Sequence, residues 1–314
     1  MGGRHARNAR DLGAAVTAYD SDEQCRAALA DDGFYVTANP DEALQGDVGV
    51  IATPAMTHTD YLARAIDAGM HVLVEKPFSD SVLGLEAVLE SADTQGLKVG
   101  VAQNLRYHPA VEEAINLLDD RAIGTVVGAV SIGASYLPDW RPGQDYRKNY
   151  AADPETGGVI FDWVHETDML VHLLGPARVA GAAASAGRHL DMASDESAGI
   201  VLDHVGNVLS TIYLSYAVRP ALRQTMLLGT NGRMDIDIPA RRLRQFDMAG
   251  TMVREQNFGG AHTDDYKSEL ADFVEAVKEN RMPRCSGREA LDILKTVTEI
   301  RAMAGLPSRD TNKR

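Results

Sequence analysis

Three short valine-rich runs, separated by stretches of helical length, dominate the first third of the chain. Apolar runs of this kind are typical of strands that are buried on both faces of a parallel sheet. The runs span residues 47–54, 71–74 and 98–103, and the stretches between them span residues 57–69 and 79–94. Strands and helices that alternate at this spacing predict right-handed βαβ crossovers, and therefore an α/β domain with a parallel sheet. Ser79 or Asp80 is expected to cap the second helix.

The middle run ends in Glu75, Lys76 and Pro77. Proline has a fixed φ and no N–H, so it stops the strand ladder and directs the chain out of the sheet. Open α/β sheets bind ligands at the carboxyl ends of their strands, which places Lys76 at the mouth of such a crevice. A lysine in that position is suited to proton transfer, although a surface lysine that caps a strand has the same signature.

A second cluster of ionisable residues lies between residues 158 and 174, where the sequence predicts one helix. Asp162, His165 and Asp168 are three apart, and Glu166 is four from Asp162, so helical periodicity puts them on one face. An acid beside a histidine orients the imidazole and selects its tautomer, as a general base requires. A structural histidine with acidic neighbours is the alternative.

Three motifs, in order along the chain, resemble the pattern of one family. They are Ala52-Thr53-Pro54 with His58 four residues on, Glu75-Lys76-Pro77, and Gly157-Gly158 leading through Asp162 to His165. Together they resemble the glucose–fructose oxidoreductase / inositol dehydrogenase / rhizopine catabolism family (Gfo/Idh/MocA) of nicotinamide-dependent dehydrogenases, over nearly the whole chain. The resemblance implies a Rossmann-like parallel sheet, a second domain on a largely antiparallel open sheet, and hydride transfer to or from a secondary hydroxyl of a sugar, polyol or sugar derivative.

The resemblance also implies roles for individual residues. Catalysis would fall to His165, assisted by Lys76 and Asp162, although the family usually places the aspartate four residues before the histidine, where this chain has Phe161. The cofactor-binding residues would be Gly2, Gly3, Asp20, Ala52, Thr53, Pro54, His58, Glu75, Lys76 and Asn104. The substrate-binding residues would be Lys76, Arg106, Trp140, Tyr146, Arg147, Asp162 and His165. For Asn104 and Arg106, structuring the turn before Pro109 is the alternative.

The start of the chain departs from the family pattern. Met1-Gly2-Gly3-Arg4 looks like the last glycine of G-x-G-x-x-G and the first turn of the following helix, so the first strand and two glycines are missing as written. Either the natural start lies roughly 10–15 residues upstream, which we favour because the downstream motifs are intact, or the protein binds dinucleotide poorly. Asp20 follows Gly2 by about the 20 residues expected before the ribose-binding acid, which favours NAD over NADP.

Aromatic and basic residues between 136 and 147 are the best candidates for contacts with a substrate. Trp140 and Tyr146 offer faces for the C–H surfaces of a sugar, and Arg147 offers donors for its hydroxyls. Arg141 or Arg147 is also suited to a carboxylate or phosphate, as in a uronic acid or a nucleotide sugar. An ordered loop that packs on its neighbours is the alternative for each of them.

Before Arg121 strands alternate with helices, and after it strands follow one another with few helices between them. This change predicts a domain boundary, with a truncated dinucleotide-binding domain at 1–120 and a substrate and oligomerisation domain at 121–314. Neighbouring strands follow, with an Asn231-Gly232 turn signal and with Arg241, Arg242 and Arg244 on a solvated sheet face. Two terminal helices, 263–279 and 286–304, are expected to pack back on the first domain. The family resemblance implies a homodimer or homotetramer.

Charge and cysteine content exclude other classes of function. A net charge of −14 disfavours nucleic acid and anionic membranes as partners, and Cys25 and Cys285 lack the spacing of a zinc site or a disulfide framework. No metal and no membrane span are expected, and the N-terminus lacks the apolar core of a signal peptide, so we expect a cytoplasmic enzyme. The rival hypothesis is a sugar sensor or regulator on the same fold, with impaired dinucleotide binding.

Overall fold

A computed structural model describes residues 1–307, which form two compact units. Unit 1 comprises Met1–Asn104 and Ala261–Asp292, and unit 2 comprises Leu105–Gly260 and the residues from Ile293 onward. The sequence placed the boundary near residue 121, whereas the structure places it at Leu105. The reason is that the helix that begins at Pro109 packs on strands of the unit 2 sheet.

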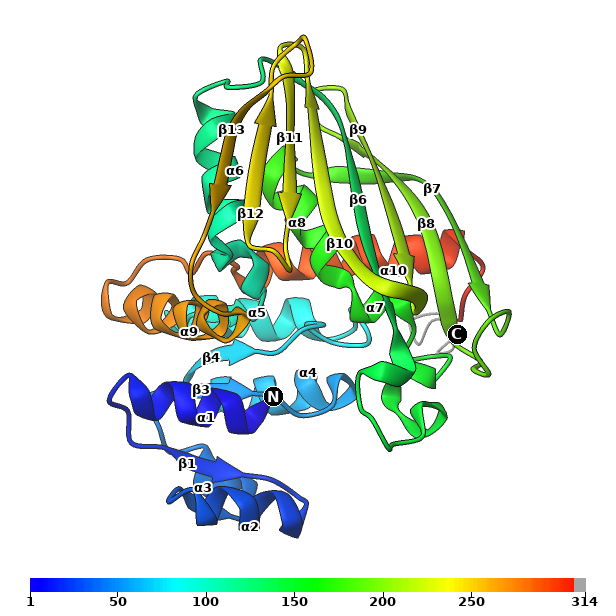
Figure 1. Ribbon diagram of the computed structural model, residues 1–314. Helices are drawn as coiled ribbons and strands as arrows, with labels where there is room; N and C mark the ends of the chain where they lie inside the picture. Colours follow the sequence, from blue (N-terminus) through cyan, green and yellow to red (C-terminus); the bar gives the residue numbers. More distant parts are fainter. Residues whose placement is uncertain (308–314) are drawn as a thin grey trace. The chain divides into compact units, whose positions relative to one another are not determined.

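Unit 1 alternates strands and helices, as the spacing of its apolar runs predicts (Figure 1). Its elements are α1 (Gly2–Asp11), β1 (Thr17–Tyr19), α2 (Glu23–Asp31), β2 (Tyr35–Thr37), α3 (Pro40–Ala43), β3 (Val48–Ile51), η1 (Ala55–Thr57), α4 (His58–Asp67), β4 (His71–Val74), α5 (Leu85–Thr94), β5 (Val99–Val101), α9 (His262–Lys278) and the start of α10 (Gly287–Met303). Strands β3, β4 and β5 form one parallel sheet, and β1 and β2 form another. The Rossmann-like parallel arrangement is therefore confirmed.

The two parallel sheets of unit 1 are not hydrogen-bonded to each other. Within the described residues, β1 pairs only with β2, and β3 pairs only with β4, so each has one edge without a strand neighbour. The additional strand implied by the family resemblance would lie between these two edges. Its existence stays a prediction.

Helix α9 forms the core of unit 1 together with the middle of the sheet. Leu73 of β4 lies in one buried cluster with Leu270 and Phe273 of α9, and Ala9 of α1 packs against it. Burying each of these apolar side chains contributes on the order of 1.5–3 kcal/mol. The late segment 261–292 is thus part of unit 1, although it follows the whole of the second sheet in the sequence.

Helix α5 begins later than the sequence predicts. Ser79 and Asp80 are buried in the turn instead of capping the helix, which starts at Leu85 after Gly84 at φ +79°. The Ser79 hydroxyl lies 3.0 Å from that of Thr59, which belongs to α4. Residues that look like helix caps are therefore used here to hold the turn after β4.

Unit 2 is built on an eight-stranded sheet in the order β13-β12-β11-β10-β6-β9-β8-β7 (Figure 1). The strands are β6 (Val126–Tyr136), β7 (Ala177–Ala186), β8 (Asp195–His204), β9 (Val208–Ser215), β10 (Ala217–Gly229), β11 (Gly232–Asp237), β12 (Arg242–Phe246) and β13 (Met252–Asn257). Only the β6–β9 pair is parallel, so the expectation of a largely antiparallel sheet is confirmed. The Asn231-Gly232 signal marks the turn between β10 and β11.

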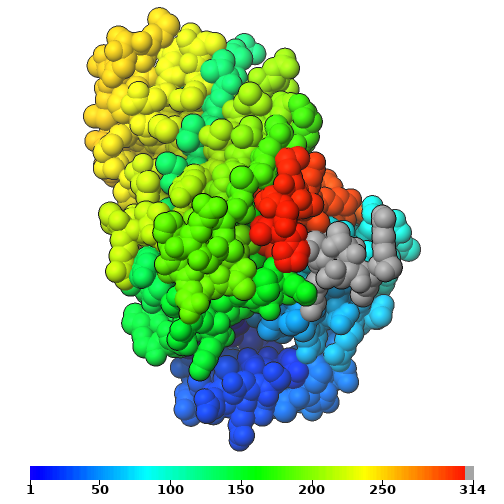
Figure 2. Space-filling model, turned by 90° about the vertical axis from the view of Figure 1, so that its right-hand side faces the viewer, coloured from blue at the N-terminus to red at the C-terminus, as the bar shows by residue number. Residues whose placement is uncertain are grey.

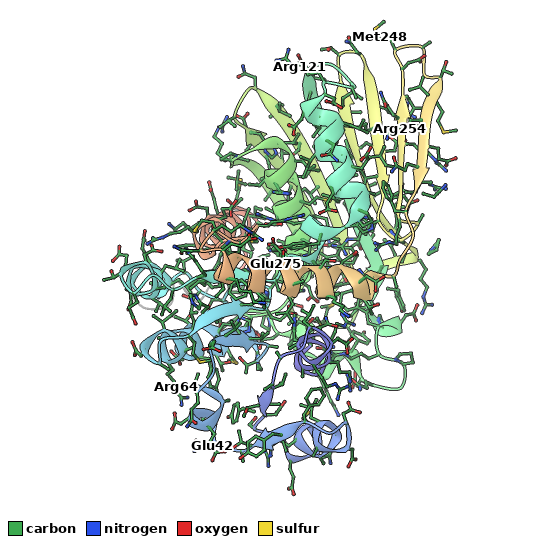
Figure 3. All side chains as sticks on the ribbon, turned by 90° about the vertical axis from the view of Figure 1, so that its left-hand side faces the viewer. Glu42, Arg64, Arg121, Met248, Arg254 and Glu275 are labelled. Carbon is green, nitrogen blue, oxygen red and sulfur yellow. The ribbon has the colours of Figure 1, made fainter. Side chains whose placement is uncertain are left out.

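One face of this sheet is covered by helices, among them α6 and α8. Helix α6 (Pro109–Asp119) packs on β11 and β12, and Arg254 of β13 pairs with its Glu113 at 2.7 Å (Figure 3). Helix α8 (Val164–Leu174) packs on β6 and β9. Gly133 of β6 allows this approach, because a Cβ there would lie 2.3 Å from Cε3 of Trp163.

The opposite face of the sheet has no covering helix among the described residues of unit 2. Leu209 and Tyr213 of β9 are about half exposed on it, at 53% and 47%. The edge strand β7 exposes mainly small side chains and lies on the side of unit 2 that faces the viewer in Figure 2. No helix within residues 1–307 is both long enough and apolar enough to span a membrane.

Candidate functional site

The carboxyl ends of β3, β4 and β5 form one edge of the unit 1 sheet, because parallel strands end on the same side. The turn Ala52–Pro54 follows β3, Glu75 and Lys76 follow β4, and Asn104 follows β5. The apolar runs in the sequence predicted that these residues lie at the ends of strands. Lys76 is half-buried in this edge.

Glu75 connects this edge to the first turn of α1. Its Oε1 lies 2.8 Å from Nε2 of His5, and its Oε2 accepts the backbone N–H of Lys76 at 3.1 Å. Burial by itself would raise the pKa of Glu75. The hydrogen bond and charge of His5, together with Lys76, outweigh that effect and hold the pKa below its ordinary value. Glu75 therefore acts as a buried carboxylate that fixes the backbone beside Lys76.

His58 lies buried between two of the turns at this edge. Its Nε2 lies 2.8 Å from the carbonyl oxygen of Thr53, and its Nδ1 lies 3.1 Å from that of Pro77. The Thr57 hydroxyl donates to that of Thr53 at 2.8 Å. These contacts give His58 a structural role that links the turns after β3 and β4. Its contribution to cofactor binding stays a prediction.

Asn104 is 1% exposed, and neither its Nδ2 nor its Oδ1 has a hydrogen-bond partner among the described residues. Leaving both ends of a buried amide unpaired is costly, on the order of 1–3 kcal/mol for each group. The carboxamide of a nicotinamide ring carries a matching donor and acceptor. The alternative that Asn104 caps the following turn finds no support in this geometry, since the side chain bonds to no backbone group there.

The N-terminus of α1 and Asp20 are two further places where the sequence predicts contacts with a dinucleotide. A Cβ on Gly2 would lie 3.8 Å from that of Ala52, so the first turn of α1 adjoins the turn after β3. The first-turn N–H groups of a helix favour an anion such as a pyrophosphate. Asp20 follows β1, and its Oδ1 accepts the N–H of Asp22 at 2.9 Å.

In unit 2, the predicted single helix is interrupted at Trp163. Residues Val159–Asp162 form α7, and α8 starts at Val164, with Trp163 between them at φ −99° and ψ 32°. His165, at 7% exposed, therefore lies in the first turn of α8 and Asp162 at the end of α7. The expectation that one regular helix face carries these groups is wrong, because α7 ends at Asp162 and α8 begins anew at Val164. Two tertiary contacts fix α7, one at its end and one at its start.

Two tyrosines provide the first of these contacts. The hydroxyl of Tyr150 donates to Oδ1 of Asp162, and that of Tyr216 donates to Oδ2, each at 2.8 Å. Tyr216 is fully buried, and burial together with the charge of Asp162 raises its pKa well above the ordinary value, so the phenol remains a donor. Neither tyrosine was predicted from the sequence, because nothing local marks a hydroxyl that bonds to a carboxylate 12 or 54 residues away.

Asp195 and Arg301 provide the second contact. Oδ2 of Asp195 accepts the N–H of Ile160 at 2.9 Å, and its Oδ1 accepts from Arg301 at 2.8 Å. Arg301 also donates to the carbonyl oxygen of Gly157 at 3.1 Å. Gly158 stands at φ +95°, and a Cβ there would lie 1.9 Å from Oδ1 of Asp195. The glycine pair of the family motif thus makes room for a buried carboxylate that starts α7.

The remaining acids of α8 are paired with arginines. Asp168 receives Arg106 through two nitrogens, at 3.0 and 2.8 Å, and both side chains are almost fully buried. Arg223 donates to Glu166 at 2.6 Å. This geometry favours the alternative in which Arg106 is structural, because its guanidinium holds α8 instead of facing solvent.

The loop from Leu137 to Asp153 carries the residues expected to contact a substrate. Trp140 is 38% exposed, its indole N–H donates to Ser135 at 2.8 Å, and its ring centroid lies 5.5 Å from that of Tyr216. The Tyr146 hydroxyl accepts the N–H of Asp191 at 3.0 Å. Arg147 pairs with Asp145 at 2.8 Å and with Asp191 at 3.3 Å. Arg147 is therefore neutralised by acids of its own chain.

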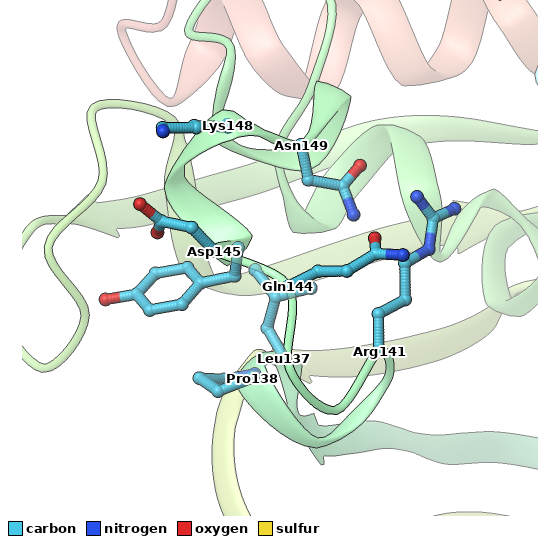
Figure 4. Close-up of a pocket in the computed structure, with 8 residues that line it drawn as sticks. Leu137, Pro138, Arg141, Gln144, Asp145, Lys148 and Asn149 are labelled. Carbon is cyan, nitrogen blue, oxygen red and sulfur yellow. The ribbon is translucent and has the colours of Figure 1, made fainter.

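A cavity of about 340 Å³ opens in this loop, with a wall formed by residues between Leu137 and Asn149 (Figure 4). Within residues 1–307, no group of three or more histidine, cysteine or acidic side chains is placed to hold a metal ion.

Two family models match consecutive parts of the chain. A model of an oxidoreductase family with an NAD-binding Rossmann fold matches residues 1–103, and the GFO/IDH/MocA C-terminal domain matches residues 111–235. D-xylose 1-dehydrogenase (NADP(+)) 2 of Haloferax volcanii is 27% identical over 295 residues, which cover 89% of this chain and 86% of that protein. D-apiose dehydrogenase of Paraburkholderia graminis is 31% identical over 181 residues, or 57% of this chain and 46% of that protein.

Among solved structures, levoglucosan dehydrogenase in complex with NADH and levoglucosan superposes with a TM-score of 0.88. The match covers 97% of this chain and 94% of that chain at 17% identity, so the likeness is one of fold.

Proposed function

The chain belongs to the Gfo/Idh/MocA family of oxidoreductases, and from that premise we propose that it is an NAD-dependent dehydrogenase. Its substrate would be a secondary hydroxyl of a sugar, polyol or sugar derivative, or the corresponding ketone in the reverse direction. The observation that carries the proposal is Asn104, a buried amide with both ends unpaired, at the sheet edge that also presents Lys76. The names of the relatives, which are dehydrogenases of xylose and apiose, support the substrate class.

The residues of unit 1 fit a nicotinamide dinucleotide. Asn104 would hold the carboxamide, the first turn of α1 at Gly2 and Gly3 would face the pyrophosphate, and Asp20 would accept hydrogen bonds from the ribose. The Haloferax relative carries NADP(+) in its name. We propose NAD here, because the carboxylate of Asp20 repels a 2′-phosphate and no arginine follows it at positions 21 and 22.

When bound, the dinucleotide supplies a hydride acceptor or donor at its nicotinamide ring. In the proposed mechanism, His165 takes the hydroxyl proton of the substrate, and the Lys76 ammonium hydrogen-bonds the reacting oxygen and stabilises its charge. Glu75 fixes the backbone at Lys76 through its N–H. Asp162, held by Tyr150 and Tyr216, ends α7 one turn before His165.

The direct test is NADH formation from NAD⁺ with D-xylose, D-glucose, myo-inositol and their acid and phosphate derivatives. Lys76→Ala and His165→Ala should each lower kcat by about 10²–10⁴-fold, as loss of an acid–base group does. NAD⁺ affinity, measured by calorimetry, should change little.

Lys98→Ala is the matched control, because Lys98 precedes β5 at the opposite edge of the same sheet. Turnover of Lys76→Ala equal to that of Lys98→Ala would refute the assignment. Sugar binding by a chain that forms no NADH would instead support the sensor hypothesis.

We also propose that the uncovered face of the unit 2 sheet joins two copies of the chain. Val130, Ile132, Met226 and Leu228 share this face with Leu209 and Tyr213, because they are cross-strand partners or alternate with them. The charges on the neighbouring strands are already paired, for example Arg244 with Glu255 at 2.9 Å, so two identical faces would not repel. Sedimentation should show a dimer or larger species that Tyr213→Lys dissociates.

A further inference from the structure

One arginine of the loop cavity lacks a partner. Among the described residues, no acid lies within ion-pair distance of Arg141, whereas Arg147 is held by Asp145 at 2.8 Å and Arg219 pairs with Asp139. The side chains of Arg141, Gln144 and Asn149 end on the same side of the cavity, and those of Asp145 and Lys148 end on the other (Figure 4). The Asp145 carboxylate is thus directed away from Arg141 and is neutralised elsewhere.

The same side of the cavity carries neutral polar groups. Oδ1 of Asn149 is buried and has no hydrogen-bond donor among the described residues. The amide of Gln144 adds both a donor and an acceptor beside it. A ligand that matches this wall would bring hydroxyl groups for the side-chain amides of Gln144 and Asn149 and an anionic group for Arg141.

The loop that lines the cavity also contacts one residue of the proposed reaction site, Asp162. Asn149 directly precedes Tyr150, whose hydroxyl donates to Asp162 at 2.8 Å. Asp162 ends α7, one turn before His165. A molecule in the cavity is therefore held by the same loop that positions the end of α7.

We propose that the substrate of this enzyme is an anionic sugar derivative, whose carboxylate or phosphate is bound by Arg141 and whose hydroxyls are bound by Gln144 and Asn149. This inference rests on the proposed dehydrogenase function, and it narrows the substrate class. A guanidinium binds either anion through two parallel N–H donors. The chain carries a net charge of −14, so its long-range field repels anions, and an unpaired cation on the cavity wall reverses that effect locally.

The experiment measures binding by calorimetry in the presence of NAD⁺, with D-glucuronate, D-glucose 6-phosphate and D-glucose as probes. At least one anionic probe should bind the unaltered protein about tenfold or more tightly than D-glucose does. Arg141→Gln should weaken that binding by roughly 10–100-fold, as expected for the loss of a charged hydrogen bond. Arg141→Lys should restore part of it, and binding of D-glucose should not change.

Arg178→Gln is the matched control, because Arg178 is an exposed arginine of the same unit that pairs with Asp203 on the sheet. It should leave every affinity unchanged. A preference for D-glucuronate assigns the anion as a carboxylate, and a preference for D-glucose 6-phosphate assigns it as a phosphate. Equal affinity for D-glucose and both anions, or anion binding that Arg141→Gln does not weaken, overturns the inference.

NADH formation with each probe separates this inference from the proposed function. Turnover of neutral sugars that does not depend on Arg141 would support the dehydrogenase function and contradict the proposal of an anionic substrate. Anion binding that depends on Arg141, without any NADH formation, would support the anion site and contradict the dehydrogenase function.

Discussion

Glu75 and Asp195 are both buried carboxylates that hold a segment of the candidate site, yet their surroundings differ. Glu75 in unit 1 faces a histidine and a backbone N–H, at 2.8 and 3.1 Å. Asp195 in unit 2 faces an arginine and a backbone N–H, at 2.8 and 2.9 Å. The pKa of Glu75 lies below its ordinary value, because His5 and Lys76 outweigh burial. The pKa of Asp195 is raised, because burial outweighs Arg301 and the N–H of Ile160.

The difference shows that a partner of permanent charge does not guarantee a depressed pKa. Burial raises the pKa of both carboxyls, and the direction is decided by whether the hydrogen bonds and charges around each one outweigh that burial. It also shows two ways of building a site: Glu75 fixes the residue next to it, whereas Asp195 gathers a helix start, a glycine pair and the C-terminal helix around one charge.

The largest loss of stability is expected from Arg301→Gln. It strips Asp195 of its counter-ion and removes donors from the carbonyl oxygens of Gly157 and Pro154. Breaking a buried ion pair by removing one partner costs about 3–5 kcal/mol. We expect a correspondingly lower urea midpoint, while Arg178→Gln, which removes an exposed pair, should cost no more than about 1 kcal/mol. Equal losses in the two variants would contradict the role given to Arg301.

A smaller effect is expected from Glu75→Gln. The substitution keeps the shape but leaves His5 without a carboxylate, which costs about 1.5–3 kcal/mol for a hydrogen bond to a charged group. The urea midpoint of the variant reports it. Glu42→Gln is the control, because Glu42 is exposed on α3 and should change nothing (Figure 3). Equal midpoints in the two variants would show that Glu75 does not anchor the backbone beside Lys76.

The smallest effect is the pH dependence, and its sign differs between the two carboxylates. The folded pKa of Glu75 is depressed, so its contribution is present above its unfolded pKa of about 4.3 and is lost as the pH falls through the folded pKa. The folded pKa of Asp195 is raised, so its contribution is full below about 3.9 and is lost as the pH rises through the folded pKa.

Urea titrations from neutral pH to pH 3 check these signs. The stability gap between the unaltered protein and Glu75→Gln should narrow on acidification, and the gap to Asp195→Asn should shift in favour of the unaltered protein. If the free energies of unfolding of Glu75→Gln and Asp195→Asn change with pH in the same way, the pKa values of the two carboxyls do not shift in opposite directions.

The sequence predicted those parts of the site that depend on local pattern. Strand period and Pro77 place Lys76 and Glu75 at the end of β4, and Asn104 follows β5 for the same reason. The alternation of strands and helices in unit 1 and the broad sheet of unit 2 follow from apolar periodicity and turn signals.

The parts that failed depend on contacts between distant segments. Helix α7 is fixed at its end by Tyr216 and at its start by Asp195 and Arg301, and all three lie far from it in the sequence. The Arg106–Asp168 pair spans 62 residues, so no local pattern distinguishes it from a substrate contact. Ser79 looks like a helix cap, and only the neighbouring Thr59 explains why it is buried in a turn.

Both tryptophans of the chain, Trp140 and Trp163, lie in one aromatic cluster, with ring centroids 6.3 Å apart. One belongs to the loop that lines the cavity, and the other joins α7 to α8. Intrinsic fluorescence excited at the indole band therefore arises entirely from this region of unit 2. The protein carries its own optical reporter of ligand entry into the loop, while unit 1 remains spectroscopically silent at that wavelength.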